Sequence, residues 1–582
     1  MRDQTATANV LPSSISLRVA RHAQLSATAI EAPEGTISYA DLDARVSSLA
    51  GALVTAGVTP GSLVAVCLPR SIAQITALLA AWRVGAGYLP LDPAWPQARF
   101  ASFVARADCS AIITDLGDIA GETPVVAPDA RGTAMPPATG DLAYVIFTSG
   151  STGEPKAVEV GHDNLAALVD WHNAAFAVTA GTRSSHLAGL GFDAAAWEVW
   201  PTLAAGGTLV LADDATRLDT HALKDWLVAQ RVEVAFAPTA LAEPLVRMDW
   251  PTDAALRVLL TGADKLTVRP KAGQRFAFVN NYGPTECTVV ATSGVVASDG
   301  AGLPAIGSAI AGTTIHLLDP MGNDVAPGCA GEICIGGAQV ARGYRGDAAL
   351  TERKFAVHEE YGRLYLTGDL ALRLESGEYQ FLGRVDGQVK VRGHRIEPAE
   401  VTAALGALAD VASSHVVVRD GELVAYVVPA SDTTAGSLRA ALAETLPDYM
   451  VPTHFAHLET MPLTANGKVD VRALPDPLTC MMIEGTEARA PSTPTEQRLF
   501  EIISDVLGHK GFGVDDDFFL LGGHSLLGTQ VIIRARDAFG IDLSLFHLFE
   551  APTVAKLAEV VENLIFAKIE SMSDEDIARL SA

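Results

Sequence analysis

The hydrophobic positions of the first 210 residues follow two alternating periodicities. Residues 37–56 repeat apolar side chains every three or four positions, which predicts an amphipathic helix with one buried stripe: Leu42, Val46, Leu49 and Leu53. Residues 63–68 form a short continuous apolar run, as expected of a buried strand, and residues 73–84 are typical of an apolar helix. Strands that alternate with helices in this way predict a largely parallel α/β sheet.

A polar loop follows the apolar, β-prone residues 142–146. The loop, residues 147–156, reads Phe-Thr-Ser-Gly-Ser-Thr-Gly-Glu-Pro-Lys and precedes a second strand-like segment, residues 157–160. Its glycines allow close approach of the backbone to a ligand, its hydroxyls can donate to anionic oxygens, and Lys156 adds positive charge. These properties fit a triphosphate. The alternatives are a flexible Gly/Ser hairpin or a Walker loop, and the second is excluded because no Gly-Lys-Ser/Thr opens a helix.

Length and composition exclude several classes of protein. A chain of 582 residues, 49% of them hydrophobic, is too long for one core, so we expect three or four domains. A net charge of −26 argues against nucleic acid or an acidic membrane surface as a partner. The six cysteines show no CxxC spacing, which indicates reduced thiols in a cytoplasmic protein. The N-terminus lacks the apolar segment of a signal peptide, and no uncharged apolar run is long enough for a membrane span.

Further motifs surround the polar loop in a fixed order. They lie at residues 39–42, 87–93, 192–198, 280–286, 331–337, 341–344, 365–370, 383–397, 446–452, 466–470 and 515–527. Those up to residue 470 together resemble the motifs of adenylate-forming enzymes, which include acyl-CoA synthetases, luciferases and the adenylation domains of nonribosomal peptide synthetases, and residues 515–527 resemble a peptidyl carrier domain. The resemblance covers residues 30–567. We assign mainly a scaffolding role to residues 331–337 and 341–344.

The resemblance implies an α/β fold with a large adenylate-forming N-terminal subdomain and a small mobile α/β C-terminal subdomain, followed by an all-α four-helix carrier domain. The expected boundaries are residues 16–385 and 386–474 for the two subdomains, 475–493 for a linker, 494–567 for the carrier domain and 568–582 for a tail. Asp386 stands at the family's hinge, where a few residues can absorb a large rotation, and Gly393 is expected to line a thiolation tunnel.

The resemblance also assigns an ATP site. The expected catalytic residues are Thr148, Ser149, Lys156 and Lys468. The expected ATP-binding residues are Gly150, Ser151, Thr152, Gly153, Tyr282, Gly283, Thr285, Asp369 and Arg384. The two oxygens of Asp369 suit the vicinal diol of ribose, and Glu286 is expected to hold Mg²⁺ near the triphosphate. Without the resemblance, residues 282–285 would be an ordinary Gly-Pro turn and Lys468 a solvated turn lysine.

An amino-acid pocket is implied by the same resemblance. Asp193 is expected to pair with the substrate's α-ammonium group, although a helix N-cap is an alternative role. The remaining positions are Ala194, Trp197, Ala235, Leu259, Thr261, Asn281, Val289 and Val290, with Lys468 at the substrate carboxylate. This lining is neutral, which disfavours a charged side chain, and the set resembles leucine-type pockets of the family. We therefore expect leucine or a similar aliphatic amino acid, with an aromatic one as the alternative. Each apolar residue here could also be plain core.

The segment Gly522-Gly523-His524-Ser525 resembles the attachment site of a peptidyl carrier domain. Ser525 is then expected to take the 4′-phosphopantetheine arm from a phosphopantetheinyl transferase. The implied reaction forms aminoacyl-AMP from ATP and an amino acid and transfers the aminoacyl group to the arm's thiol. We expect a stand-alone loading didomain that serves a downstream condensation or tailoring enzyme, with a small activating protein as a further partner. The alternatives are an acyl-CoA-synthetase-like carboxylic acid ligase, a D-alanine:carrier ligase and a non-catalytic binding module.

Overall fold

The computed structural model forms two compact units, the first made largely of residues before 389 and the second of residues after it. It describes residues 14–116, 123–138, 140–149, 154–300, 302–385, 389–391, 394–419, 422–462, 469–477, 480, 489–507, 512–516, 518, 521, 523, 525–541, 543, 547–548 and 551–570. Seven residues of the expected site lie outside these ranges: Gly150, Ser151, Thr152, Gly153, Asp386, Gly393 and Lys468.

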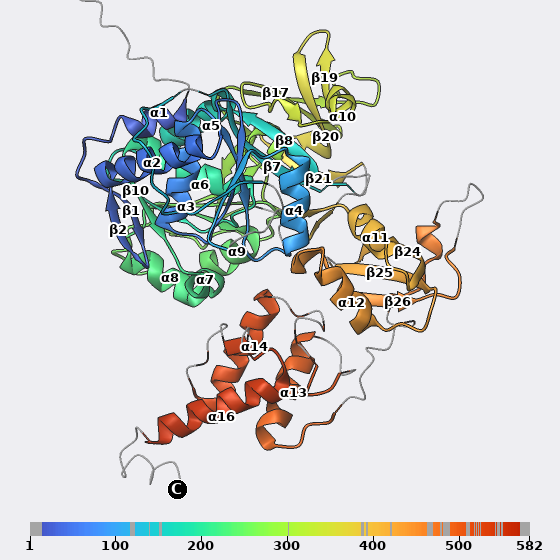
Figure 1. The fold of residues 1–582 in the computed structure, drawn as a ribbon. Helices are drawn as coiled ribbons and strands as arrows, with labels where there is room; N and C mark the ends of the chain where they lie inside the picture. The colour runs from blue at the N-terminus through green and yellow to red at the C-terminus, as the bar shows by residue number, and fades with distance from the viewer. Residues whose placement is uncertain are drawn as a thin grey trace, which may run out of the picture. The chain divides into compact units, whose positions relative to one another are not determined.

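Two large sheets form the frame of the first unit (Figure 1). The nine-stranded sheet runs β15 (Ser308–Ala309), β14 (Thr292–Val295), β13 (Ala277–Tyr282), β12 (Val258–Gly262), β11 (Val234–Pro238), β9 (Arg183–His186), β10 (Thr208–Leu211), β1 (Thr28–Ala32) and β2 (Gly35–Ser38). The seven-stranded sheet runs β18 (Gly343–Tyr344), β8 (Lys156–Gly161), β7 (Leu142–Thr148), β4 (Gly87–Leu91), β3 (Leu63–Cys67), β5 (Ala111–Thr114) and β6 (Val125–Val126). The central strands of both sheets pair in parallel, as the alternating pattern predicted.

Helices pack on both sheets. The helices of this unit are α1 (Ile15–Ala20), α2 (Tyr39–Thr55), α3 (Ile72–Arg83), α4 (Gln97–Arg106), α5 (His162–Ala175), α6 (Asp193–Ala205), most of α8 (Thr220–Ala229), α9 (Thr239–Arg247) and α10 (Ala348–Lys354). The short helix α7 (Asp214–Leu218) precedes α8 in the chain and is grouped with the second unit. Helices α3 and α5 pack on the seven-stranded sheet, whereas α2 and α6 pack on the nine-stranded sheet. The largest core lies among them, where the rings of Trp82 and Trp200 are 4.2 Å apart. The predicted helices at 37–56 and 73–84 are confirmed.

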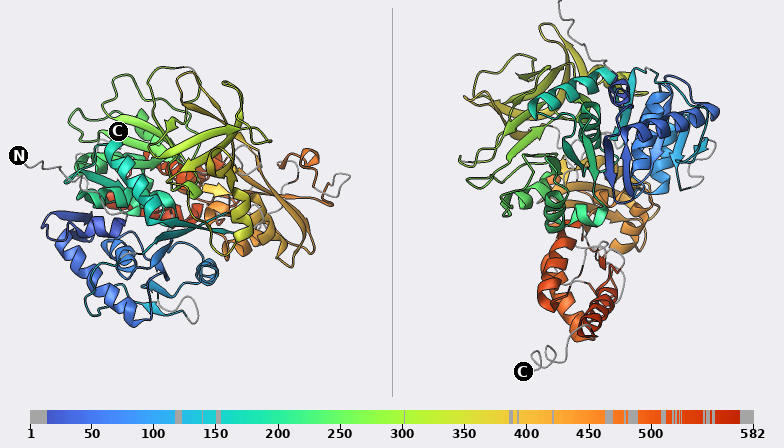
Figure 2. Two further views of the ribbon diagram at one scale, coloured as in Figure 1. Left: turned by 90° about the horizontal axis from the view of Figure 1, so that it is seen from above. Right: turned by 90° about the vertical axis from the view of Figure 1, so that its left-hand side faces the viewer.

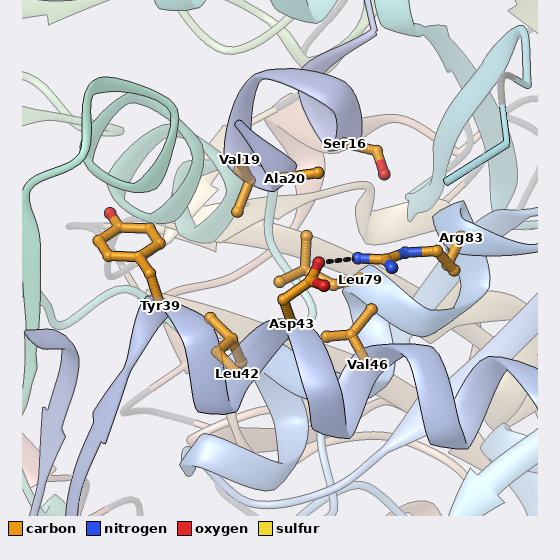
Figure 3. Close-up of a pocket in the computed structure, with 9 residues that line it drawn as sticks. All are labelled: Ser16, Val19, Ala20, Tyr39, Leu42, Asp43, Val46, Leu79 and Arg83. Atoms are coloured by element: carbon orange, nitrogen blue, oxygen red, sulfur yellow. Dashed lines mark hydrogen bonds and ion pairs between the residues drawn. The ribbon is translucent and has the colours of Figure 1, made fainter. Parts of the chain in front are cut away.

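The N-terminal helix α1 covers α2 and α3 (Figure 3). Asp43 of α2 and Arg83 of α3 form an ion pair beneath it. The residues that line the groove between the three helices are Ser16, Val19, Ala20, Tyr39, Leu42, Asp43, Val46, Leu79 and Arg83. Because Arg83 is only 5% exposed, Asp43 supplies the negative charge that a buried guanidinium needs.

A third, antiparallel sheet completes the first unit. It contains β16 (Thr313–Leu318), β17 (Gly331–Gly337), β20 (Gly362–Arg373), β19 (Phe355–His358) and β21 (Tyr379–Arg384). Residues Asp369 and Arg384 are register partners across β20 and β21. The short 3-10 helix η1 (Thr285–Cys287) follows β13 in the nine-stranded sheet. These elements carry most of the expected ATP-site residues.

The second unit contains a small α/β lobe and a helical domain. The lobe contains β22 (Val389–Val391), β23 (His394–Ile396), α11 (Pro398–Gly406), β24 (Val411–Arg419), β25 (Glu422–Pro429), α12 (Ala435–Ala443), η2 (Asp448–Met450), β26 (His454–His457) and η3 (Val471–Ala473). The helical domain contains α13 (Pro494–Leu507), α14 (Ser525–Phe539) and α16 (Val554–Glu570), which Figure 2 shows in red. Each has its own hydrophobic core. The expected fold class is confirmed, and the exact domain boundaries stay predictions. Among the described residues, we find no helix whose length and apolar character would suit a membrane crossing.

Candidate active site

Asp369, in the middle of β20, is the centre of a hydrogen-bonded cluster that also includes the last residues of β13 and β21. The hydroxyl of Tyr282 donates to Asp369 Oδ2 at 2.5 Å, and Arg384 Nη1 donates to Oδ1 at 2.5 Å. Arg384 also donates to the carbonyl oxygen of Thr367 at 3.0 Å. Burial, followed by the charge of Asp369, raises the pKa of the Tyr282 hydroxyl well above its usual range, so this hydroxyl acts as a donor. The structure therefore brings together three of the expected ATP-binding residues.

The polar loop has the strand–loop–strand form that the sequence predicted. Strand β7 ends at Thr148, strand β8 begins at Lys156, and the two residues are register partners across the antiparallel pair. Ser149 is buried. The buried Thr148 Oγ1 has no hydrogen-bond partner in the part of the chain that is described. A buried hydroxyl without a partner is costly, so this atom is suited to meet a ligand oxygen.

Glu286 lies in η1, immediately after the Gly-Pro turn. Its side chain is fully buried, and its Oε1 accepts a 2.8 Å hydrogen bond from the hydroxyl of Tyr344. Among the described residues, we find no group of three or more His, Cys, Asp or Glu side chains that could hold a metal ion. A single carboxylate fits Mg²⁺ nevertheless, because this ion is usually held by one or two carboxylates together with substrate phosphates. Glu286 and the neighbouring hydroxyl of Tyr344 offer only oxygen atoms, which are the ligands that Mg²⁺ prefers.

Asp193 is the first residue of α6 and interacts with Thr285 and Glu286 of η1. The hydroxyl of Thr285 and the backbone N–H of Ala194 both donate hydrogen bonds to its carboxylate. Burial raises the pKa of Asp193, and the charge of Glu286 raises it further, whereas the two hydrogen bonds lower it. Asp193 thus contacts its own helix start, as an N-cap would, and also stands within the electrostatic field of the expected metal carboxylate. The structure therefore brings Asp193, Thr285 and Glu286 together.

Glu198, five residues after Asp193 in α6, supports Asp193 in a way that its sequence motif did not predict. Its buried carboxylate accepts hydrogen bonds from the backbone N–H groups of Leu187 at 2.9 Å and Ala188 at 2.7 Å. The side chains of Ser185 and His186 also reach it, at 3.4 Å and 3.3 Å. Glu198 therefore joins the end of β9 to α6 and holds the connecting segment that leads to Asp193. The sequence feature that could have indicated this role is the presence of an acidic residue inside an otherwise apolar helix.

Trp197 marks the side of α6 that faces the nine-stranded sheet. Its ring lies 5.3 Å from the ring of Phe236, and its Nε1 donates to His172 Nδ1 at 2.9 Å. Burial lowers the pKa of His172 to about 3, so the imidazole is neutral and can accept this hydrogen bond. Phe236 and its register partner Leu260 belong to the same core as Trp197. Phe236 and Leu260 therefore project towards α6.

Three expected pocket residues lie on the opposite face of this sheet. Ala235 and Leu259 are register partners that flank Phe236 and Leu260 in sequence, and Thr261 follows Leu260. Since side chains alternate across a strand, all three project away from Trp197. The residues that share the face of Trp197 are Phe236, Leu260 and Gly262, each one position further along its strand. We therefore propose these three as the pocket positions in place of Ala235, Leu259 and Thr261.

The remaining pocket positions lie at the ends of β13 and η1. Asn281 donates through Nδ2 to the carbonyl oxygens of Thr261 at 3.0 Å and Val279 at 3.1 Å. Val289 and Val290 belong to the core that contains Trp197, and Ala194 packs against it. Val289 has a positive φ of 72°, which is strained for a β-branched residue. Ser525 begins α14, but its side chain lies outside the description, as do the seven residues named above.

The comparisons with known proteins agree with this geometry. Residues 17–345 match the AMP-binding enzyme family, residues 400–468 match the AMP-binding enzyme C-terminal domain, and residues 497–561 match the phosphopantetheine attachment site. Over 555 residues the chain is 42% identical to a linear gramicidin synthase of Brevibacillus parabrevis, covering 90% of this chain and 11% of that protein. It is 36% identical to bacitracin synthase 1 of Bacillus licheniformis, covering 92% of this chain and 10% of that protein.

A solved structure matches nearly the whole chain. Holo-PA1221, described as an NRPS protein containing adenylation and PCP domains bound to a vinylsulfonamide inhibitor, is 31% identical, with a TM-score of 0.79. That match covers 95% of this chain and 97% of the other. By contrast, the chain spans only 7 to 11% of the length of the linear gramicidin synthases that it matches.

Proposed function

Because the chain belongs to the AMP-binding enzymes, as a nonribosomal peptide synthetase adenylation domain followed by a carrier domain, we propose that it activates leucine or a similar aliphatic amino acid. The adenylation domain is an AMP-forming ligase that uses ATP with Mg²⁺, and the carrier domain carries 4′-phosphopantetheine. One observation carries the proposed substrate: beyond Asp193, the apolar side chain of Trp197 on α6 faces those of Phe236 and Leu260 on the sheet.

The shape of this lining favours a branched aliphatic side chain over an aromatic one. Phe236 occupies volume where the smaller Ala235 had been expected, so less room remains for a substrate ring. Gly262 lies on the same face as Leu260, and a Cβ there would be 2.7 Å from the carbonyl oxygen of Asn281. Apart from Asp193 and Lys468, none of the proposed lining residues carries a charge. An acidic or basic substrate side chain would therefore be desolvated without a partner.

We propose that the expected site residues carry out the first half-reaction in the following roles. Asp193 pairs with the α-ammonium group, and Asp369, supported by Tyr282 and Arg384, accepts hydrogen bonds from the ribose hydroxyls. Thr148, Ser149 and Lys156 contact the phosphates, and Lys468 contacts the substrate carboxylate and the α-phosphate. A carboxylate oxygen attacks the α-phosphorus, the bond to pyrophosphate breaks, and the protein stabilises the charge on the phosphate oxygens. Mg²⁺, held at Glu286, supplies further positive charge when it is bound.

The second half-reaction transfers the aminoacyl group to the chain's own carrier domain. When attached at Ser525, 4′-phosphopantetheine supplies the thiol that takes the aminoacyl group and releases AMP. We propose that the small lobe rotates about Asp386 between the two steps, which removes Lys468 and brings Gly393 to the thiol's path. A tethered carrier raises the effective concentration of the acceptor. The partners are then a phosphopantetheinyl transferase, a downstream condensation or tailoring enzyme and a small activating protein.

The stand-alone loading didomain stays a prediction, because the curated relatives carry the matching region within much longer chains. The acyl-CoA-synthetase-like alternative is disfavoured. Such an enzyme would use free coenzyme A and would need neither Asp193 nor the carrier match at residues 497–561.

Amino-acid-dependent ATP–pyrophosphate exchange tests the proposed function. Across the proteinogenic amino acids, we expect strong exchange with leucine or a close aliphatic homologue and its loss in Asp193→Ala. In Ser525→Ala, exchange should persist while radiolabelled amino acid no longer attaches to the protein. Exchange that is undiminished in Asp193→Ala would contradict the assignment of the ammonium site, and maximal exchange with a charged amino acid would contradict the substrate class.

A further inference from the structure

We propose that Tyr344 is a positioning residue for adenylation, which joins the lysine of the polar loop to the carboxylate that holds Mg²⁺. This inference rests on the proposed function. From the sequence, only a scaffolding role was expected for the segment around Tyr344. In the structure, Tyr344 is the side chain that contacts both Glu286 and Lys156.

The ring and the hydroxyl of Tyr344 serve different partners. The hydroxyl donates to Glu286 Oε1 at 2.8 Å and lies 3.5 Å from the hydroxyl of Tyr365. The Nζ atom of Lys156 lies over the ring, 5.6 Å from its centroid, which is within the range of a cation–π interaction. Tyr344 is 5% exposed and Glu286 is fully buried, so water competes little for the hydrogen bond between them.

The backbone explains why Tyr344 reaches both groups. Strand β18 pairs antiparallel with β8, and Tyr344 is the register partner of Val158, two residues after Lys156. The backbone N–H of Ala341 donates to the carbonyl oxygen of Glu286 at 2.9 Å, which attaches η1 to the same segment. The strand that carries Tyr344 is therefore bonded to the strand that begins with the loop lysine and to the turn that carries the carboxylate.

The neighbouring residues hold the backbone of Tyr344 in one position. Gly343 has a φ of 143°, and a Cβ there would lie 2.4 Å from Thr351 Cγ2, so this backbone conformation requires glycine. The backbone N–H of Tyr344 donates to Thr351 Oγ1 at 2.9 Å. The backbone N–H of Arg345 donates to the carbonyl oxygen of Ala157 at 2.8 Å. A side chain on a backbone held in this way can fix the separation between a cation and a carboxylate, which phosphate and metal binding require.

Two substitutions separate the roles of the hydroxyl and the ring. Tyr344→Phe removes only the donor to Glu286, whereas Tyr344→Leu also removes the aromatic face beneath Lys156. Tyr365→Phe is the matched control, because it removes a neighbouring buried hydroxyl but leaves the 2.8 Å bond between Tyr344 and Glu286 in place. Thermal unfolding of all three variants establishes that each is folded.

The measurement is Mn²⁺ binding to the full-length protein in the presence of ATP and the absence of amino acid. The electron paramagnetic resonance signal of free Mn²⁺ monitors the binding. We expect Tyr344→Phe to weaken Mn²⁺ binding about tenfold, since hydrogen bonds to charged groups have that order of effect. ATP affinity measured without metal should be unchanged in Tyr344→Phe and lower in Tyr344→Leu. The Tyr365→Phe variant should bind Mn²⁺ nearly as the wild type does.

The outcomes are distinguishable. Wild-type affinity for Mn²⁺ in Tyr344→Phe would overturn the positioning role while leaving the proposed function intact. An equal loss in Tyr365→Phe would also overturn it, because Tyr344 would then be only one part of a packed cluster. If the wild-type protein bound no Mn²⁺ with ATP, the proposed function itself would fail, and this inference with it.

Discussion

The ring of Trp197 on α6 lies 5.3 Å from the ring of Phe236 on β11. This contact defines the face of the nine-stranded sheet that we propose the substrate side chain meets. Phe236 and Leu260 share this face, whereas Thr261 projects from the other one. Leu260 and Thr261 are adjacent in sequence, but we expect only Leu260 to affect substrate specificity.

Phe236→Ala is expected to enlarge the pocket and change its preference. Loss of the ring should raise the activation free energy for leucine by about 2 kcal/mol, which corresponds to a roughly thirtyfold lower kcat/KM. The reason is that a hydrophobic pocket discriminates by about 1–3 kcal/mol per group. Exchange with phenylalanine should rise relative to leucine, since the removed ring leaves matching volume. The measurement is ATP–pyrophosphate exchange with both amino acids.

Thr261→Val is the matched control on the opposite face. Thr261 is fully buried, and its Oγ1 has no partner among the described residues. Replacing this hydroxyl by a methyl group should leave the leucine-to-phenylalanine ratio unchanged and stabilise the fold by about 1 kcal/mol, because a buried unpaired hydroxyl is costly. If Thr261→Val changed the ratio as strongly as Phe236→Ala, our assignment of the faces would be wrong.

The difference between these two residues shows what the sequence could and could not predict. Apolar periodicity was sufficient for α2, and the strand–loop–strand form around Lys156 was correct. The register of β11 and β12 was not accessible, because central parallel strands are buried on both faces and show no polar alternation. The roles of Glu198 and Tyr344 depend on partners in other elements, which no local pattern reveals.

Asp193→Asn is expected to weaken amino-acid binding without affecting ATP binding. Truncating a buried, hydrogen-bonded charge pair costs about 3 kcal/mol, which is on the order of a hundredfold in kcat/KM. The isosteric amide keeps the hydrogen bond at the start of α6, so a helix-cap role alone would leave the KM for the amino acid unchanged. Steady-state exchange at varied amino acid and ATP concentrations separates the two roles.

The same substitution should stabilise the unliganded protein in a pH-dependent way. Burial raises the pKa of Asp193 above the usual 3.8, so the folded state holds this proton more tightly than the unfolded chain does. Stability is then lost as pH rises from the unfolded pKa through the folded pKa, and it stays lower above that range. Asp193→Asn lacks this loss, so its Tm should exceed that of the wild type at neutral pH and converge with it in acid. A Tm difference that grew on acidification would contradict the sign.

Glu198→Gln is expected to disturb Asp193 from a distance. The amide group cannot accept all the hydrogen bonds that Leu187 and Ala188 donate, so we expect a loss of about 2–4 kcal/mol in stability. The KM for the amino acid should rise more than the KM for ATP, because the segment before Asp193 is released. Thermal unfolding and exchange kinetics measure the two effects.

Glu243→Gln is the control for this prediction. Glu243 also accepts from a backbone N–H, that of Thr267 at 2.7 Å, but this hydrogen bond is exposed. Its substitution should change stability by less than about 0.5 kcal/mol, as is usual for surface positions. Similar losses of stability in both variants would show that the burial of Glu198 does not make its hydrogen bonds more stabilising than those of an exposed carboxylate.

Asp369→Asn is expected to remove the recognition of ribose. Tyr282 and Arg384 fix the two oxygens of Asp369 at 2.5 Å each, so the carboxylate presents its remaining acceptor sites in one direction. The wild type should bind ATP more tightly than 2′,3′-dideoxy-ATP by about 1.5–3 kcal/mol, the contribution of hydrogen bonds to a charged group. In Asp369→Asn this difference should largely disappear, because the loss of the diol and the loss of the charge remove the same interaction.

Equilibrium binding of both nucleotides to both proteins completes this double-mutant cycle. Additive losses, with the full ATP preference retained in the variant, would show that Asp369 orders β20 and β21 without contacting the ribose.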